Sequence, residues 1–212
     1  GITILSPDDQ SARIRFSSPS TNTEVGGASI FYRQNLNKMS IGTAVTGGTM
    51  ILRSGADVDA VVCDGAGIVT MPLQPAFTVL NSELLNIQVA TAETTVPFNR
   101  EAFDRNNDFN SSNYTFTAPV QGTYQLTGQF RIRGLQNDID YIYFNLIATN
   151  LSVANIFEYS GADDADYHTV NVTLLVDMAA THTAIFKVYQ SGGSAETDLG
   201  QDTCIFSGFL VG

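Results

Sequence analysis

The sequence predicts an all-β protein, and composition, alternation and glycine placement each support this. Charged residues make up only 15% of the 212 residues, whereas long amphipathic helices are usually rich in Ala, Glu, Lys and Leu. Apolar and charged residues alternate in Arg13-Ile14-Arg15-Phe16, which is the period-2 pattern of a half-buried strand. Glycines such as Gly47 interrupt these runs as turns would. We therefore expect short strands and little helix.

Residues 1–72 contain β runs that are too short to build a sandwich of their own. A region of about 70 residues without a large central core is difficult to stabilise alone. Three chains wound around one axis would let each strand bury its apolar face against the other two. We therefore expect an intertwined trimeric β shaft, and the alternative is a loosely packed monomeric β domain. The runs are 12–16, 28–32, 50–53 and 58–62.

The glycine-punctuated segments 39–43, 47–53 and 64–71 resemble the shaft repeats of phage tail fibres and tailspikes. This resemblance implies that residues 1–72 belong to a fibre. Pro72 and Pro75 end the pattern, because proline lacks the N–H that a central ladder needs. We expect residues 73–94 to form a connector, which is similar to the junction before the heads of such fibres.

Residues 95–212 have longer strand patterns and two characteristic motifs. Residues 114–124 read YTFTAPVQGTY, and residues 206–210 read FSGFL. Together with Val96-Pro97-Phe98-Asn99 they resemble the signature of the C1q family. The resemblance implies a C1q/tumour-necrosis-factor-like jelly-roll sandwich, and heads of this family are typically trimers. The expected strands, 124–133, 139–150, 153–159, 167–176, 182–190 and 203–211, suit two packed antiparallel sheets.

Two of these expected strands carry apolar groups on both faces. They are residues 141–147 and 184–189. A strand buried on both faces is unusual in an antiparallel sandwich. We therefore expect one face to cover the core and the other to line a subunit interface.

The net charge of −11 argues against nucleic acid or anionic lipid as a partner, because both require paired cations. No run of about 18 apolar residues suggests membrane insertion, and residues 1–20 lack the pattern of a signal peptide. Gly1 directly precedes a strand-like run, so we expect a piece of a longer polypeptide. Cys63 and Cys204 form no motif with His168 or His182, which predicts buried free thiols.

The sequence contains no catalytic constellation, since no nucleophile is spaced with a general base. Clustered loop acids suggest calcium as the one possible cofactor, because hard oxygen ligands suit this ion. Neither cluster has EF-hand spacing, and the alternative is that these acids are simply solvated. The candidate ligands are Asp138, Asp140, Asp163, Asp164 and Asp166.

Several polar and aromatic residues in or beside expected surface loops are candidates for receptor contact. Exposed aromatic rings next to hydrogen-bonding groups suit glycan or protein recognition. Ordinary loop packing is the alternative for each of them. The candidates are Tyr159, Tyr167, His168, Glu196 and Asp198.

These observations favour a trimeric phage or viral fibre tip that belongs to the virion and acts outside the cell. It would bind a bacterial surface glycan or outer-membrane protein by multivalent adhesion, without enzymatic activity. Three alternatives remain open at this point: a secreted C1q-like lectin or ligand, a polysaccharide depolymerase fragment, and a virion decoration without a receptor.

Overall fold

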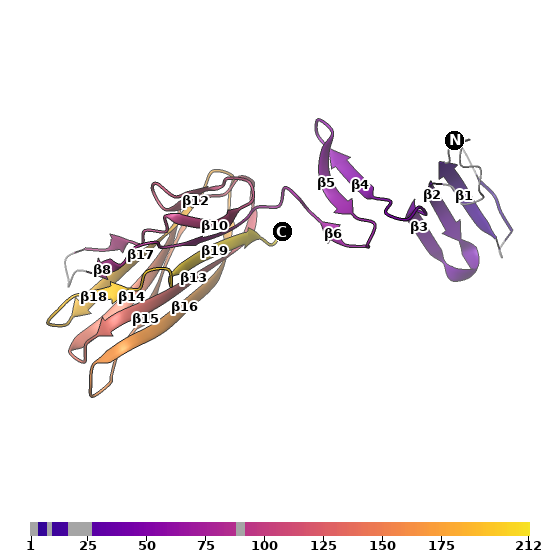
Figure 1. The fold of residues 1–212 in the computed structure, drawn as a ribbon. Coiled ribbons are helices and arrows are strands. Elements are labelled where there is room, and N and C mark those ends of the chain that lie inside the picture. The colour runs from indigo at the N-terminus through magenta and orange to yellow at the C-terminus, as the bar shows by residue number, and fades with distance from the viewer. Residues whose placement is uncertain (1–3, 8–9, 17–26, 88–91) are drawn as a thin grey trace. The chain divides into compact units, whose positions relative to one another are not determined.

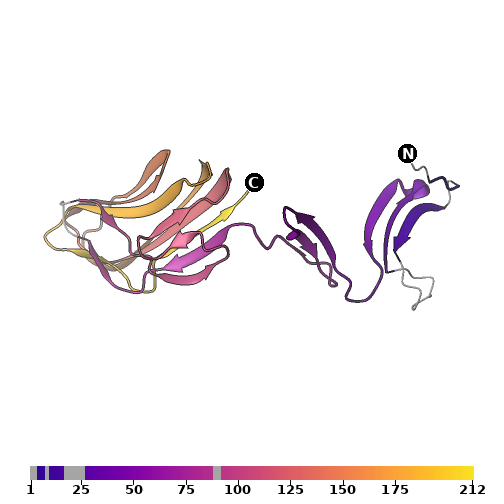
Figure 2. The same ribbon diagram turned by 90° about the horizontal axis from the view of Figure 1, so that it is seen from above.

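The computed structural model describes residues 4–7, 10–16, 27–87 and 92–212, which form two compact units, 1–73 and 74–212 (Figures 1 and 2). The expected all-β class is confirmed. Within the described ranges the helical structure is one short 3-10 turn, Gln34–Leu36. No helix among these residues is long and apolar enough to cross a membrane.

Unit 1–73 contains two small antiparallel sheets, each a three-stranded meander. The first consists of β1 (Ser11–Phe16), β2 (Ala28–Arg33) and β3 (Lys38–Thr43), and the second of β4 (Met50–Ser54), β5 (Val58–Cys63) and β6 (Val69–Thr70). In the first sheet Ile14 lies opposite Ile30, and Ile30 lies opposite Ile41. The alternating pattern of the sequence therefore places an apolar row on one sheet face.

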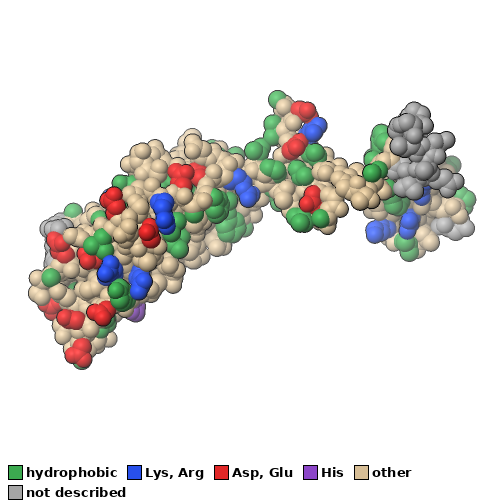
Figure 3. Space-filling model, viewed as in Figure 1, with side chains coloured by type: hydrophobic (Ala, Val, Ile, Leu, Met, Phe, Trp, Pro, Cys, Tyr) green, Lys and Arg blue, Asp and Glu red, His purple; other side chains and the backbone are tan. Residues whose placement is uncertain are grey.

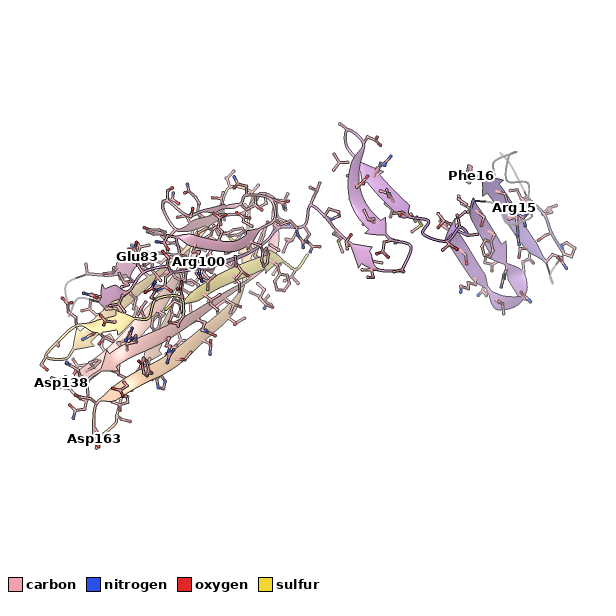
Figure 4. The ribbon with its side chains drawn as sticks, viewed as in Figure 1. Arg15, Phe16, Glu83, Arg100, Asp138 and Asp163 are labelled. Atoms are coloured by element: carbon pink, nitrogen blue, oxygen red, sulfur yellow. The ribbon has the colours of Figure 1, made fainter. Side chains whose placement is uncertain are left out.

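This unit has no core of its own among its described residues, none of which is buried. Phe16 is 59% exposed, Leu52 57% and Ile41 55%. Figure 4 labels Phe16 and Arg15 at the end of β1. Small isolated sheets are marginally stable in water, and apolar side chains left exposed add nothing to their stability.

Unit 74–212 is a sandwich of two antiparallel sheets (Figures 1 and 2). The seven-stranded sheet contains β10 (Arg100–Asp104), β7 (Ala76–Leu80), β19 (Ile205–Leu210), β13 (Gly122–Leu135), β18 (Thr197–Leu199), β8 (Leu85–Ile87) and β16 (Ala165–Met178). The six-stranded sheet contains β11 (Phe109–Asn110), β12 (Thr115–Thr117), β17 (Thr183–Gly192), β14 (Ile139–Ala148), β15 (Leu151–Phe157) and β9 (Thr94–Thr95).

Aromatic rings fill the space between the two sheets. Phe206 is fully buried and lies 4.9 Å from the ring centroid of Phe186 and 5.0 Å from that of Phe77. Both contacts are edge-to-face, the arrangement that the charge distribution of aromatic rings favours. The expected motif around the β12–β13 turn also lies here: Tyr124 packs on Phe116 at 5.4 Å, and its hydroxyl donates to the carbonyl of Val120 at 2.8 Å.

The sandwich begins earlier in the chain than the sequence indicates. Residues 76–87 were expected to lie in a connector, but they supply β7 and β8 of the seven-stranded sheet. The reason is the alternation of Phe77 and Val79, which point into the core. Pro75 does not prevent this, because its carbonyl accepts a hydrogen bond from the N–H of Leu210 at 3.1 Å.

A buried polar residue joins the end of β7 to the loop before β19. Asn81 is fully buried, and its side-chain amide donates to the carbonyls of Glu83 at 2.8 Å and Gly200 at 3.0 Å. Its side-chain oxygen accepts from the N–H of Cys204 at 3.1 Å. Each polar atom of this side chain therefore has a partner, as burial requires.

Candidate functional site

The sandwich starts and finishes at one end. The side chain of Gln74 donates to the carbonyl of Leu210 at 2.7 Å, and Thr123 N–H donates to the carbonyl of Gly212 at 2.8 Å. The loops that contain Asp138 and Asp163 lie at the opposite end, which we call the distal end (Figure 4). The distal loops are therefore far from the point where residue 74 enters the sandwich.

Hydrogen bonds join three loops at the distal end. Asn137 donates through its backbone N–H to Asp164 at 2.9 Å and through its side chain to the carbonyl of Ala162 at 2.9 Å. The side chain of Gln136 accepts from the backbone N–H of Ser194 at 3.0 Å and that of Ala195 at 2.9 Å. Loops 136–138, 161–164 and 193–196 therefore form one connected surface.

The candidate calcium ligands occupy this end, and two of them already bond other residues of the fold. Asp164 holds Asn137, as described above, and Asp140 accepts from the Ser191 hydroxyl at 3.3 Å. Asp166 lies in strand β16 rather than in a loop. Within the described residues no group of three or more acidic, His or Cys side chains is placed to hold a metal ion. Calcium binding stays a prediction from composition.

Two of the candidate receptor residues line a shallow groove on the outer face of the seven-stranded sheet. Its volume is about 580 Å³. It lies where β13 and β16 approach the distal end, and Figure 3 shows basic groups, a hydrophobic group and a His there. It is lined by Gln129, Arg131, Tyr167, His168, Thr169, Asp202, Thr203 and Ile205.

Tyr167 lies between two arginines, of which Arg131 lines the groove with it. The guanidinium carbon of Arg131 lies 4.2 Å from the ring centroid of Tyr167, and that of Arg133 lies 5.6 Å away. The sequence Arg-Ile-Arg places both side chains on the same face of β13, while Ile132 is buried in the core between them. Each contact has cation–π geometry, which holds the charge over the ring.

The electrostatics of this groove differ from those of the chain as a whole. The net charge is −11, yet among the described residues neither Arg131 nor Arg133 has a carboxylate within ion-pair distance. The ion pair beside it joins Arg100 to Asp202 at 3.2 Å. Guanidinium groups without a carboxylate partner can bind carboxylate, phosphate or sugar hydroxyl oxygens.

The other sequence candidates surround this groove at different distances. His168 stacks on Phe157 at 4.3 Å between ring centroids, and Tyr159 lies 6.4 Å from the same ring. Asp198 of β18 is the register partner of Arg133. Glu196 lies in the loop just before β18. Sequence reasoning missed the two arginines, although their spacing of two residues in a predicted strand indicates a shared face.

Comparison with known proteins identifies the sandwich. The model of the C1q domain family matches residues 76–211. The globular domain of zebrafish complement 1qA has a similar structure, with a TM-score of 0.52 and 20% identity over 66% of this chain and 98% of that one. Murine APRIL at pH 8.0 gives a TM-score of 0.47 and 8% identity over 65% of this chain and 99% of that one.

Comparison with curated proteins gave no match. Domains of the C1q/TNF-like type are commonly trimeric and typically act as non-enzymatic binding modules. The family match covers more than half of the sequence and has the same extent as the sandwich, β7 to β19. The chain belongs to the C1q domain family.

Proposed function

We propose that this chain is the trimeric tip of a phage or viral fibre, which binds a glycan or outer-membrane protein on a bacterial host. Residues 1–73 form the end of a β shaft, and the sandwich is the receptor-binding head. The proposal rests mainly on the absence of buried residues among the described part of unit 1–73. A fibre of three intertwined chains supplies the missing cover.

The first support is the amount of apolar surface that unit 1–73 leaves in water. Ile41, Leu52 and Phe16 are each more than half exposed. Contiguous exposed apolar surface of this kind marks interaction sites. Two further copies around one axis would cover the isoleucine row of the first sheet, and the trimeric habit of the C1q family supports that number.

The second support is an uncharged surface on the head, formed by the outward residues of β13, β16 and β19 between Arg131 and Asp177. Thr127 and Thr173 share a hydrogen bond of 3.2 Å across the strands. Leu175 is 64% exposed and Phe209 is 45% exposed. Depletion of charge with exposed large apolar groups is typical of the centre of a protein interface. This face suits contact between heads.

The third support is the separation of the two ends of the sandwich. The distal end carries polar loops and the Arg131–Tyr167 groove, whereas the chain enters and leaves at the other end. Loops carried on a rigid sheet scaffold are a frequent place for recognition. Three weak sites on one tip would raise the effective affinity without any new contact.

The mass of the chain in solution, measured beside binding to candidate bacteria, tests this proposal. We expect three times the 22.8 kDa chain mass and saturable binding to at least one host. A stable monomer would refute the shaft. A trimer that binds no bacterium and does not block adsorption would instead indicate a decoration without a receptor.

The family match also suits a second candidate, a secreted C1q-like lectin or ligand that is unrelated to virions. The uncovered apolar residues of unit 1–73 favour the fibre, because a free-standing ligand would not carry an exposed β shaft. Release of soluble sugar from host polysaccharide would point to a depolymerase instead.

A further inference from the structure

The outer face of the six-stranded sheet carries a cluster of three tyrosines that no predicted role accounts for. Ile142 and Phe144 of β14 point into the core, so Tyr141 and Tyr143 point outward. Tyr189 of β17 is the register partner of Tyr143 and points the same way. All three side chains are partly buried.

The three rings form a compact triangle, which we call the tyrosine cluster. The ring centroids of Tyr143 and Tyr189 lie 5.1 Å apart, and Tyr141 lies 6.3 Å from each of them. Ile156 of β15, which is 59% exposed, is the register partner of Tyr143 on its other side. The sheet therefore presents an aromatic surface with one aliphatic neighbour.

Hydrogen-bonding groups adjoin the tyrosine cluster. Partial burial, together with the nearby carboxylate of Glu93, raises the pKa of Tyr143 above its usual value. Asn145 donates to Glu93 at 2.8 Å, and the ammonium of Lys187 lies 3.9 Å from the other oxygen of Glu93. On another side Asp140 accepts from Ser191 of β17. Aromatic surface and polar acceptors thus meet in one place.

The charges select among possible occupants of this face. The carboxylates of Glu93 and Asp140 outnumber the one ammonium group, that of Lys187. This surface therefore repels an anionic ligand, and the net charge of −11 does the same at longer range. The strand pattern alone suggests a subunit interface here, but the uncharged face of the seven-stranded sheet offers a better surface for a second head, because interface centres are depleted of charge. That arrangement leaves the tyrosine cluster in solvent.

We propose that the tyrosine cluster of Tyr141, Tyr143 and Tyr189 is a binding site for a neutral glycan. The inference rests on the proposed receptor-binding function and names the chemical class of receptor for this face. The apolar face of a sugar ring packs on the tyrosine rings, and its hydroxyls hydrogen-bond the tyrosine hydroxyls and the Glu93 carboxylate. Sites that bind and orient a small ligand usually combine an aromatic surface with a small number of polar groups.

Titration of the assembled chain, residues 1–212, with neutral hexose oligomers and with acidic oligosaccharides of equal length tests this site. The chain contains eight tyrosines and no tryptophan, so the three rings of the cluster contribute to tyrosine emission without a tryptophan background. Tyr189→Ser removes one ring, and Tyr189→Phe keeps the ring without the hydroxyl. Phe103→Ser is the matched control, because it removes a half-exposed aromatic ring from β10 of the opposite sheet. Near-ultraviolet circular dichroism and solution mass check folding and assembly.

We expect a neutral oligomer to bind and Tyr189→Ser to weaken it by about tenfold or more, as loss of a central aromatic contact does. Tyr189→Phe should keep most of the affinity, and Phe103→Ser should match the unmodified chain. Equal binding by Tyr189→Ser, a preference for acidic oligomers, or dissociation of the trimer by Tyr189→Ser would overturn the inference.

Cell binding separates failure of this inference from failure of the proposed function. Periodate oxidises vicinal diols of surface sugars and leaves most proteins in place. If the trimer binds cells and periodate abolishes that binding, the inference is supported. Binding that survives periodate but not protease would overturn the neutral glycan while the adhesin function stands. A trimer that binds no cells would count against the adhesin function itself.

Discussion

Asn81→Ala tests how much the buried hydrogen bonds of Asn81, which join the end of β7 to the loop before β19, contribute to the stability of the sandwich. The substitution removes the bonds to Glu83, Gly200 and Cys204. Each hydrogen bond of this kind contributes about 1 kcal/mol net, and the orphaned Cys204 N–H adds about 1–2 kcal/mol. The expected loss is therefore about 4 kcal/mol. At roughly 2–4 °C per kcal/mol for a chain of this size, the melting temperature should fall by about 10 °C.

Thermal melting followed by near-ultraviolet circular dichroism measures this loss in the full chain. Asn150→Ala is the matched control, because the exposed Asn150 side chain makes one bond, to the carbonyl of Asp177 at 3.0 Å. The control should change stability by less than about 1 kcal/mol. Similar melting temperatures for the two variants would refute the reasoning, since they would mean that burial adds nothing to the Asn81 bonds.

Three further predictions concern the core, a thiol and the shaft. Phe206→Ala should destabilise the head by about 3–5 kcal/mol in chemical denaturation, because it empties the centre of the aromatic core. Burial raises the pKa of Cys204 to about 11 from 9.0, so its thiol should resist alkylation in the native state while the partly exposed Cys63 reacts. As pH rises, the Cys204 thiol ionises in the unfolded chain before it ionises in the folded chain. The contribution of this thiol to the free energy of unfolding should therefore be unchanged below about pH 9 and fall by about 2–3 kcal/mol towards pH 11. Cys204→Ser should abolish this fall. Ile41→Asp should convert the trimer to smaller species in sedimentation while the head still melts cooperatively. An unchanged trimer would show that the isoleucine row of the first sheet is not covered by other chains.

Most of the sandwich could be predicted from the sequence because its local patterns agree with its packing, although the expected start at residue 95 left out β7 and β8. The motif with Phe116 and Tyr124 at opposite ends marks a turn whose flanking aromatics both enter the core. Buried apolar residues alternate with outward ones along β13, so its position follows from period-2 patterning. Strand β14 is apolar on both faces, so its length and composition rather than alternation indicate a strand. Short elements are harder: β18, of three residues, is held by pairing with β13 and β8 rather than by its own pattern.

The candidate sites were less predictable, because they depend on register between strands. Tyr167 could be named from the sequence as exposed, but its contact with Arg131 follows from the pairing of β13 with β16, across a long sequence separation. Tyr143 and Tyr189 were expected to line a subunit interface because the pattern shows only that their face is partly apolar. The charges of Glu93 and Lys187, which change this interpretation, come from different elements.

The common end at which the chain enters and leaves the sandwich has a consequence for how such heads can diversify. Each distal loop is tied covalently only to the two strands that flank it, so a change in its length or composition need not alter strand register or the aromatic core. Binding specificity and folding stability are then encoded by separate residues. A library that varies residues 194–196 while keeping β17, β18 and Gly193, whose φ of +92° favours glycine, would yield folded heads with new targets, in the way that antibody loops vary on a constant framework.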